Sequence, residues 1–230
     1  MGQSDYPQAP VQWAPLVLSF EVAILATLIA TVAGGALALL LATRRFVGRD
    51  LLDALFAAPM VMPPTVLGYY VLVMLGRSSP IGHAWEAVFG SSIVFTKTGA
   101  VVAATIGSLP LVVKSARAAL EEVDPRLVLA ARSLGAGAVR AFFTVHLPIA
   151  GRGVIAGVML CFARSLGDFG VTLMVAGNIP GQTQTAALAI YDAIQGQRED
   201  EALGMILVLT SLTVLALYGV NKLTAKAPRG

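Results

Sequence analysis

Five long stretches of apolar residues, separated by short polar segments, dominate the chain. They cover about residues 14–42, 51–75, 93–113, 153–176 and 203–220. About 20 mostly apolar residues are enough for a helix to cross the hydrocarbon core of a bilayer. The pattern therefore predicts an all-α protein, a polytopic transmembrane helical bundle of about five spans. A short polar segment, 1–13, would precede the bundle, and a short tail, 223–230, would follow it.

Composition supports a membrane protein. Apolar residues make up 57% of the chain and charged residues 13%, and the mean hydropathy is +0.78. Soluble domains are about half apolar and about a quarter charged. The one cysteine, Cys161, lies inside an apolar stretch, so neither a disulfide framework nor a CxxC motif is present.

The second predicted span contains two adjacent prolines, Pro63 and Pro64. Together they remove two amide donors within one helical turn, so the helix must kink or break there. Irregular backbone is tolerated at membrane depth only where protein or a water-filled cavity surrounds it. Two interpretations stay open: an element that lines or gates a transport route, or a kink required for packing.

The fourth predicted span carries two charges near its middle, Arg164 and Asp168. Their spacing of four residues would place them on one face of a continuous helix, and both should face the bundle interior. The pair could fix the packing of helices or subunits. Alternatively it could border the route, with Arg164 offering a positive field to an anion. No metal site is expected, because His83 has no second ligand nearby.

The distribution of Lys and Arg predicts the orientation. Outside the spans, most of them lie in segments 44–49, 114–152 and 222–229. The alternate segments hold only Arg77, Arg198 and, near the end of a span, Lys97. Because cytoplasmic loops are rich in Lys and Arg, we expect a periplasmic N-terminus, a cytoplasmic C-terminus and a cytoplasmic segment 114–152.

That cytoplasmic segment contains two short predicted helices. Asp124-Pro125 is a typical helix start, and Gly135 and Gly137 would end the first helix. A second helix is predicted from about Ala138 to His146, ended by Pro148. A helix of about ten residues is marginal alone in water, so the first one needs a partner.

The sequence lacks three common motifs for nucleotide binding and hydrolytic catalysis. It contains no GxxxxGK[ST] phosphate loop, no HExxH and no GxSxG. This combination is typical of a pore or transport subunit whose energy comes from another protein. We therefore expect no enzyme activity and no cofactor bound by this chain.

The cytoplasmic segment resembles the EAA loop of bacterial ABC importer permeases. Their pattern is EAA, three residues, Gly, nine residues and Ile-x-Leu-Pro. The same spacing separates Leu129-Ala130-Ala131, Gly135 and Val145-His146-Leu147-Pro148 here, with Leu129 in place of the acidic residue and Val145 in place of isoleucine. The resemblance implies that the ATPase is contacted by Leu129, Ala130, Ala131, Gly135, Leu147 and Pro148. Leu129 removes the carboxylate that could form a salt bridge at that contact.

Three other segments, Ala58–Gly76, Phe162–Thr185 and Ala187–Gln195, resemble the permeases of molybdate importers, and sulfate permeases share parts of the pattern. The resemblance covers about residues 14–222. It implies a type I ABC importer permease fold in a bacterial inner membrane, and import of molybdate, with tungstate as a further substrate, by alternating access. Asp168 stands where relatives commonly have Glu.

The resemblance also implies the partners. These are a second copy of the chain, two cytoplasmic ABC subunits that hydrolyse Mg-ATP, and a periplasmic molybdate-binding protein; nucleic acid is not among them. The binding protein would dock on the outer segment 178–195, with Asn178, Pro180, Gly181 and Gln182 as candidates. The alternative for this segment is a solvated loop with one amphipathic helix.

Other functions stay open. The chain could be a sulfate or thiosulfate ABC permease. Pro63-Pro64 and the Arg164–Asp168 pair would also suit a secondary anion carrier that needs no ATPase. An intramembrane enzyme using Asp168 is disfavoured, because no second carboxylate, metal-ligand set or nucleophile accompanies it.

Overall fold

The computed structural model describes residues 12–224, and every regular element among them is a helix. In chain order these are α1 (Trp13–Thr43), α2 (Arg49–Val61), α3 (Pro64–Leu75), α4 (Pro80–Phe89), α5 (Lys97–Glu121), α6 (Pro125–Ser133), α7 (Ala138–Ala141), the π-helical turn η1 (Phe142–His146), α8 (Leu147–Leu166), α9 (Gly170–Ala176), α10 (Ala186–Gln195) and α11 (Glu199–Thr224).

Four helical segments are long and apolar enough to cross a membrane, and the bent pair α2–α3 provides a fifth span if it is counted as one. The four are α1, α5, the run from α7 through α8, and α11. The predicted all-α transmembrane bundle of about five spans is confirmed.

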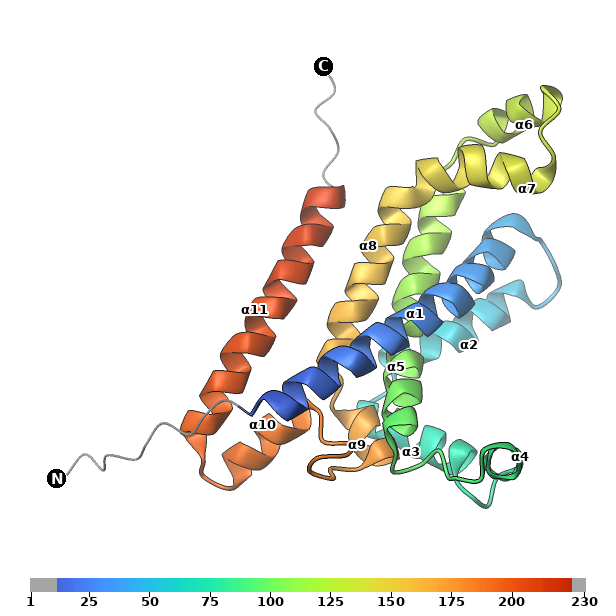
Figure 1. The fold of residues 1–230 in the computed structure, drawn as a ribbon. Coiled ribbons are helices and arrows are strands. Elements are labelled where there is room, and N and C mark those ends of the chain that lie inside the picture. The colour runs from blue at the N-terminus through green and yellow to red at the C-terminus, as the bar shows by residue number, and fades with distance from the viewer. Residues whose placement is uncertain (1–11, 225–230) are drawn as a thin grey trace.

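The short helices lie at the two ends of the bundle (Figure 1). One end carries α6, α7 and the C-terminal end of α11, and the other carries α4, α9 and α10. Two regions are therefore available to partners at opposite ends of the spans.

The second span is broken at its prolines, as the sequence predicts. Helix α2 ends at Val61, α3 begins at Pro64, and their axes differ by 117°. Pro63 caps α3 with an extended backbone and Pro64 occupies its first position, where a missing amide costs nothing. The pair thus ends one helix and starts another in a new direction.

The third span is longer than expected. Helix α5 continues to Glu121, so residues 114–121, which were expected in the loop, are helical. Pro110 lies inside α5 without ending it.

The fourth span is not continuous, and here the prediction is wrong. Helix α8 ends at Leu166, Gly167 forms its C-cap, and α9 starts only at Gly170. The amide and the hydroxyl of Thr172 both donate to Oδ2 of Asp168, at 3.0 and 2.7 Å. Asp168 therefore lies in a break between helices, where its carboxylate binds the first turn of α9, and not on the face of a span.

Pro148 does not end the second short helix either. The chain runs from α7 through η1 into α8, and Pro148 lies in the first turn of α8. Because proline has no amide hydrogen, it leaves a gap in the ordinary hydrogen-bond ladder. The π-helical turn shifts that ladder by one residue, with the amide of Leu147 donating to the carbonyl of Phe142.

Small residues hold α1, α5 and α8 together. Ala26 and Ala30 of α1 and Ala104 of α5 are almost fully buried. A Cβ atom added to Gly157 of α8 would lie 2.6 Å from Cβ of Ser115 in α5. Helices in lipid associate through such close packing, because apolar burial alone does not distinguish a neighbouring helix from an acyl chain.

Gly157→Ala should therefore destabilise the bundle by about 1–3 kcal/mol through overpacking. Gly151→Ala, in the same helix, is the matched control, because its added methyl group meets no atom within 4 Å. The test is thermal unfolding of the detergent-solubilised chain followed by size-exclusion fluorescence. Equal melting temperatures for the two variants would contradict close packing of α5 on α8.

Candidate functional site

Helix α6 projects from one end of the bundle (Figure 1). Its start follows the sequence prediction: Oδ1 of Asp124 accepts from the amide of Arg126 at 2.9 Å, and Pro125 occupies the first helical position. Both features stabilise the N-terminus of a short helix. The element is thus locally ordered although it lies outside the membrane spans.

The end of α6 depends on Gly135. This residue has φ of +87°, and the amides of Gly135 and Ala136 donate to the carbonyls of Arg132 and Ala131 at 3.0 and 3.1 Å. These two bonds form a Schellman cap, which favours glycine at this position. A Cβ atom on Gly135 would meet nothing within 4 Å, so backbone conformation and not space selects glycine.

The outer surface of α6 is apolar and uncovered. No residue of α6 is buried; Leu129 is 59% exposed and, just after the helix, Leu134 is 89% exposed. Ala130 is also exposed, and Ala131 is partly buried. The apolar residues of this segment are therefore divided, with Val128 packed on the bundle and Leu129 and Leu134 exposed.

The connection from α6 back to the membrane is anchored on α5. Nε2 of His146 lies 3.0 Å from the carbonyl oxygen of Leu120. Val128 and Phe142 pack against the cluster of Leu120, Val123 and Ala150. Leu147 is partly buried and Pro148 exposed at the start of α8. Helix α6 and the connection that follows it are thus in direct contact with the ends of α5 and α8.

A network of charged side chains joins α2 to the same end of α5. Asp53 pairs with Lys114 at 2.7 Å and with Arg117 at 3.0 Å, and Glu121 pairs with Arg49 at 2.7 Å and with Arg117 at 2.9 Å. Helix α2 has no buried residue, so these pairs are its main attachment. The sequence contains these charges but does not reveal that they meet.

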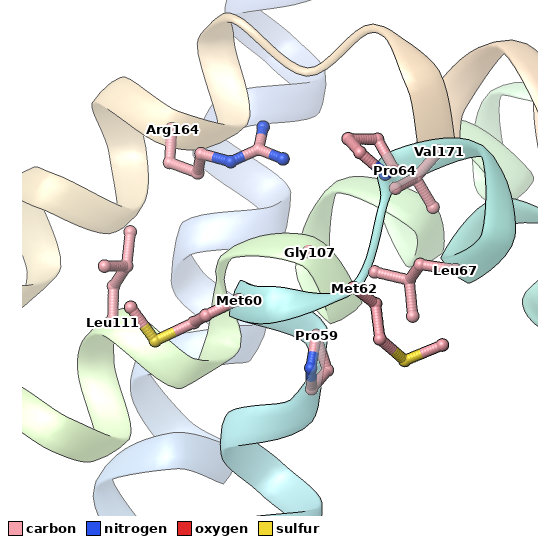
Figure 2. A pocket seen from close by; sticks show the side chains of 9 residues that line it. All are labelled: Pro59, Met60, Met62, Pro64, Leu67, Gly107, Leu111, Arg164 and Val171. Carbon is pink, nitrogen blue, oxygen red and sulfur yellow. The ribbon is translucent and has the colours of Figure 1, made fainter.

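A cavity of about 220 Å³ lies beside the break between α2 and α3 (Figure 2). It is lined by residues on both sides of the α2–α3 break and by residues of α5, α8 and α9. One charged side chain, that of Arg164, lines it; the other lining residues are Pro59, Met60, Met62, Pro64, Leu67, Gly107, Leu111 and Val171.

The predicted ion pair exists, with a different surrounding from the one expected. Nη1 of Arg164 donates to Oδ1 of Asp168 at 2.9 Å. The Asp168 side chain is 2% exposed and accepts also from Thr172, whereas the Arg164 side chain is 38% exposed and lines the cavity. The carboxylate is therefore buried and is not among the groups that line the cavity, whereas the guanidinium is.

The two broken spans pack on each other through glycines. A Cβ atom on Gly170 of α9 would lie 2.6 Å from Cβ of Pro64, and one on Gly68 of α3 would lie 2.7 Å from Cβ of Met174. Pro64 and Arg164, one member of each candidate pair, thus line one cavity although they are far apart in sequence; Pro63 and Asp168 are not among its lining residues. Met60, Met62 and Gly107 were not predicted for this region, because no local pattern marks them.

The outer loop between α9 and α10 has a fixed base and an exposed tip. Thr183 is buried, and the carbonyl of Ile179 accepts from the amides of Gln182, Thr183 and Gln184 at 3.0–3.1 Å. Asn178 is partly buried, whereas Pro180, Gly181 and Gln182 are exposed. This loop lies at the end of the bundle opposite α6 (Figure 1).

Residues 30–226 match the family model described as "Binding-protein-dependent transport system inner membrane component". The chain belongs to this family. Membership places it among multi-pass membrane proteins and agrees with the spans found in the structure.

Proteins with similar sequences include molybdenum and sulfate transport permeases. This chain is 42% identical over 207 residues to the molybdenum transport system permease protein ModB of Escherichia coli K12, covering 90% of each chain. Its identity to ModB of Haemophilus influenzae is 44% over 181 residues, 77% of this chain and 79% of the relative. The sulfate transport system permease protein CysT of E. coli K12 is 34% identical over 218 residues, 93% of this chain and 78% of the relative.

Solved structures share the fold of this transport component. A chain from a bacterial ABC transporter involved in the import of alginate gives a TM-score of 0.71 at 14% identity, covering 95% of this chain and 81% of that one. A chain from an amino acid ABC transporter crystallised with histidines gives 0.62 at 19% identity, covering 91% and 90%. The predicted ABC importer permease fold is confirmed.

Gly135→Ala should open the end of α6, because a non-glycine residue at positive φ costs about 1–2 kcal/mol. We expect hydrogen exchange of the α6 amides to accelerate about 5–30-fold. Gly137→Ala, at φ of −62°, is the control and should leave exchange nearly unchanged. Identical exchange in the two variants would exclude the glycine-dependent cap.

Asp53→Asn should loosen α2, since it removes the partner of two cations. Hydrogen bonds between charged groups contribute about 1.5–3 kcal/mol each when partly buried. The control is Asp50→Asn one turn earlier, whose carboxylate forms no ion pair among residues 12–224. Faster exchange of the α2 amides in Asp53→Asn alone is expected, and faster exchange in both or in neither would show that the network does not hold α2.

Proposed function

We propose that this chain is the permease subunit of an ABC importer that moves molybdate into the cytoplasm. The observation that carries the proposal is 42% identity to a molybdenum transport permease over 90% of both chains. The EAA-like spacing of residues 129–148, which begin in the protruding helix α6, supports it further. In this role the chain forms the route and has no catalytic site of its own.

Helix α6 is the proposed contact with the ATP-hydrolysing subunit, which uses Mg-ATP. Its exposed leucines and Ala130 provide an apolar surface, and its fixed Gly135 turn presents that surface at a constant angle. Leu129 would take part by apolar contact, where the family pattern has a carboxylate. Because α6 rests on α5 and α8, force applied to it reaches two membrane spans at once.

The orientation follows from the position of the basic residues. The α6 end of the bundle carries Arg126, Arg132, Arg140 and Arg152, and the opposite end carries Arg77, Lys97 and Arg198. The positive-inside rule then assigns α6 to the cytoplasm and the N-terminal segment to the periplasm of a bacterial inner membrane. The terminal segments 1–11 and 225–230 lie outside the described residues.

The remaining parts of the proposed importer are a second copy of this chain, two ATPase subunits and a periplasmic molybdate-binding protein. The exposed loop tip at Pro180, Gly181 and Gln182, with Asn178 at its edge, is the proposed docking surface for the binding protein. Its position opposite α6 supports this assignment.

The proposed mechanism is alternating access. ATP-driven closure of the two ATPases would rock the two copies of the permease as rigid bodies and open the route to one side and then the other. Tungstate, a tetrahedral dianion like molybdate, would follow the same route. Sulfate is the second candidate substrate, because a sulfate permease is 34% identical to this chain over most of its length.

The direct test is uptake of labelled molybdate by liposomes containing the complete importer. We expect uptake that requires ATP, the ATPase subunits and a molybdate-loaded binding protein. Molybdate movement through the permease without any ATPase would instead identify a secondary carrier. Uptake with sulfate-loaded but not molybdate-loaded binding protein would replace molybdate by sulfate.

Ala130→Trp should uncouple the importer, because a large side chain on the exposed face of α6 prevents close docking. A loss of about 2 kcal/mol of binding free energy at a central interface residue would lower the affinity for the ATPase about thirtyfold. Co-purification of the ATPase with the permease measures this loss. The control is Val47→Trp in the exposed loop between α1 and α2. Normal ATPase retention and uptake in Ala130→Trp would contradict the docking assignment.

A further inference from the structure

We propose that the cavity beside the α2–α3 break is a transient site for the transported oxyanion, and that Arg164 is the group that contacts the anion. This inference rests on the proposed function, since it concerns the route of the same substrate. It is carried by the position of one guanidinium in an otherwise apolar cavity, with its counterion buried and outside the cavity lining.

Most N–H donors of the Arg164 guanidinium have no acceptor among residues 12–224. Arg164 uses Nη1 for Asp168, and within residues 12–224 no other acceptor binds it. Its side chain is 38% exposed and lines the cavity, next to Pro64 and Gly107 (Figure 2). Arginine offers five N–H donors in a planar fork that suits oxygen pairs on an anion. Nε and Nη2 are thus the donors available to an oxyanion.

Gly107 keeps the space in front of the pair open. A Cβ atom at this position would lie 3.8 Å from Nη2 of Arg164 and 3.7 Å from Oδ1 of Asp168. The cavity volume is about 220 Å³, and one water takes ~30 Å³ of liquid volume. The space therefore accommodates an ion with four oxygen atoms and part of its hydration shell.

Asp168 limits how tightly an anion is held. Its carboxylate neutralises most of the charge of Arg164 at long range, and it is itself buried and bound by Thr172. An anion in the cavity would meet hydrogen-bond donors at close range and little net charge from further away. No second cation lines the cavity, so the ion is received and then released, as a transport route requires.

The test measures the electrostatic potential in the cavity with a cysteine in place of Met60, an exposed lining residue. The full-length permease carries Cys161→Ser and is reconstituted in liposomes. Rates of modification by an anionic and a cationic methanethiosulfonate reagent are compared. Their ratio reports local potential, and a cysteine at Ser133 on α6 serves as the remote control.

Arg164→Gln should lower the ratio of anionic to cationic rates about tenfold at Met60→Cys, by Coulomb's law at an intermediate dielectric. Arg164→Lys should retain most of the ratio, and Asp168→Asn should raise it. Ser133→Cys should respond to none of these changes. Molybdate at constant ionic strength should slow the anionic reagent in the parent and not in Arg164→Gln.

A pair that serves packing alone would give a different result: Arg164→Gln and Asp168→Asn would change the ratio in the same direction or not at all. If the thiol at position 60 reacts with neither reagent, water and ions do not enter the cavity. That result would also contradict the proposed oxyanion site. These outcomes need no ATPase or binding protein. They are therefore separable from failure of the importer assignment, which is decided by uptake into liposomes with the parent complex.

Discussion

Backbone that leaves the helical conformation inside a membrane must be enclosed by protein or water, because lipid offers no hydrogen bonds. One span is broken at Pro63-Pro64, the chain leaves the helical conformation again at Gly167–Phe169 after α8, and the helices that follow these two breaks, α3 and α9, pack against each other. Glycines at 68 and 170 allow the contact, and Asp168 binds the restarted helix α9. The cavity with Arg164 lies where these two irregular segments meet α5 and α8.

Small side chains also determine how the other spans pack. Helices α1, α5 and α8 meet through alanine and glycine, so their backbones approach closely and leave little freedom to shift independently. Helix α2 differs, since ion pairs with Lys114, Arg117 and Glu121 hold it. Both α6, the proposed coupling element, and the charged network contact the last turns of α5. That end of α5 is where a push from the ATPase would be distributed.

The sequence predicted what local patterns encode. Apolar length located the spans, Pro63-Pro64 located one break, and Asp124 and Gly135 located the ends of α6. The second break was missed because Arg164 and Asp168, four residues apart, also fit one helix face; Gly167 followed by an aspartate that can cap a new helix was the available signal. The charged network and the cavity lining were not predictable, since Asp53 reaches Lys114 and Gly107 approaches Arg164 only through tertiary packing.

The proposed mechanism requires each copy of the chain to move as a rigid body, and distances between spin labels test this requirement most directly. In the complete importer, labels on Ser133 of α6 and Thr98 at the opposite end of α5 report movement within one chain. Labels on Ser133 in both copies report movement between chains. Between the nucleotide-free and ATP-bound states, the distance between copies should change while the distance within one chain stays constant. A change within the chain as large as that between copies would contradict the rigid body.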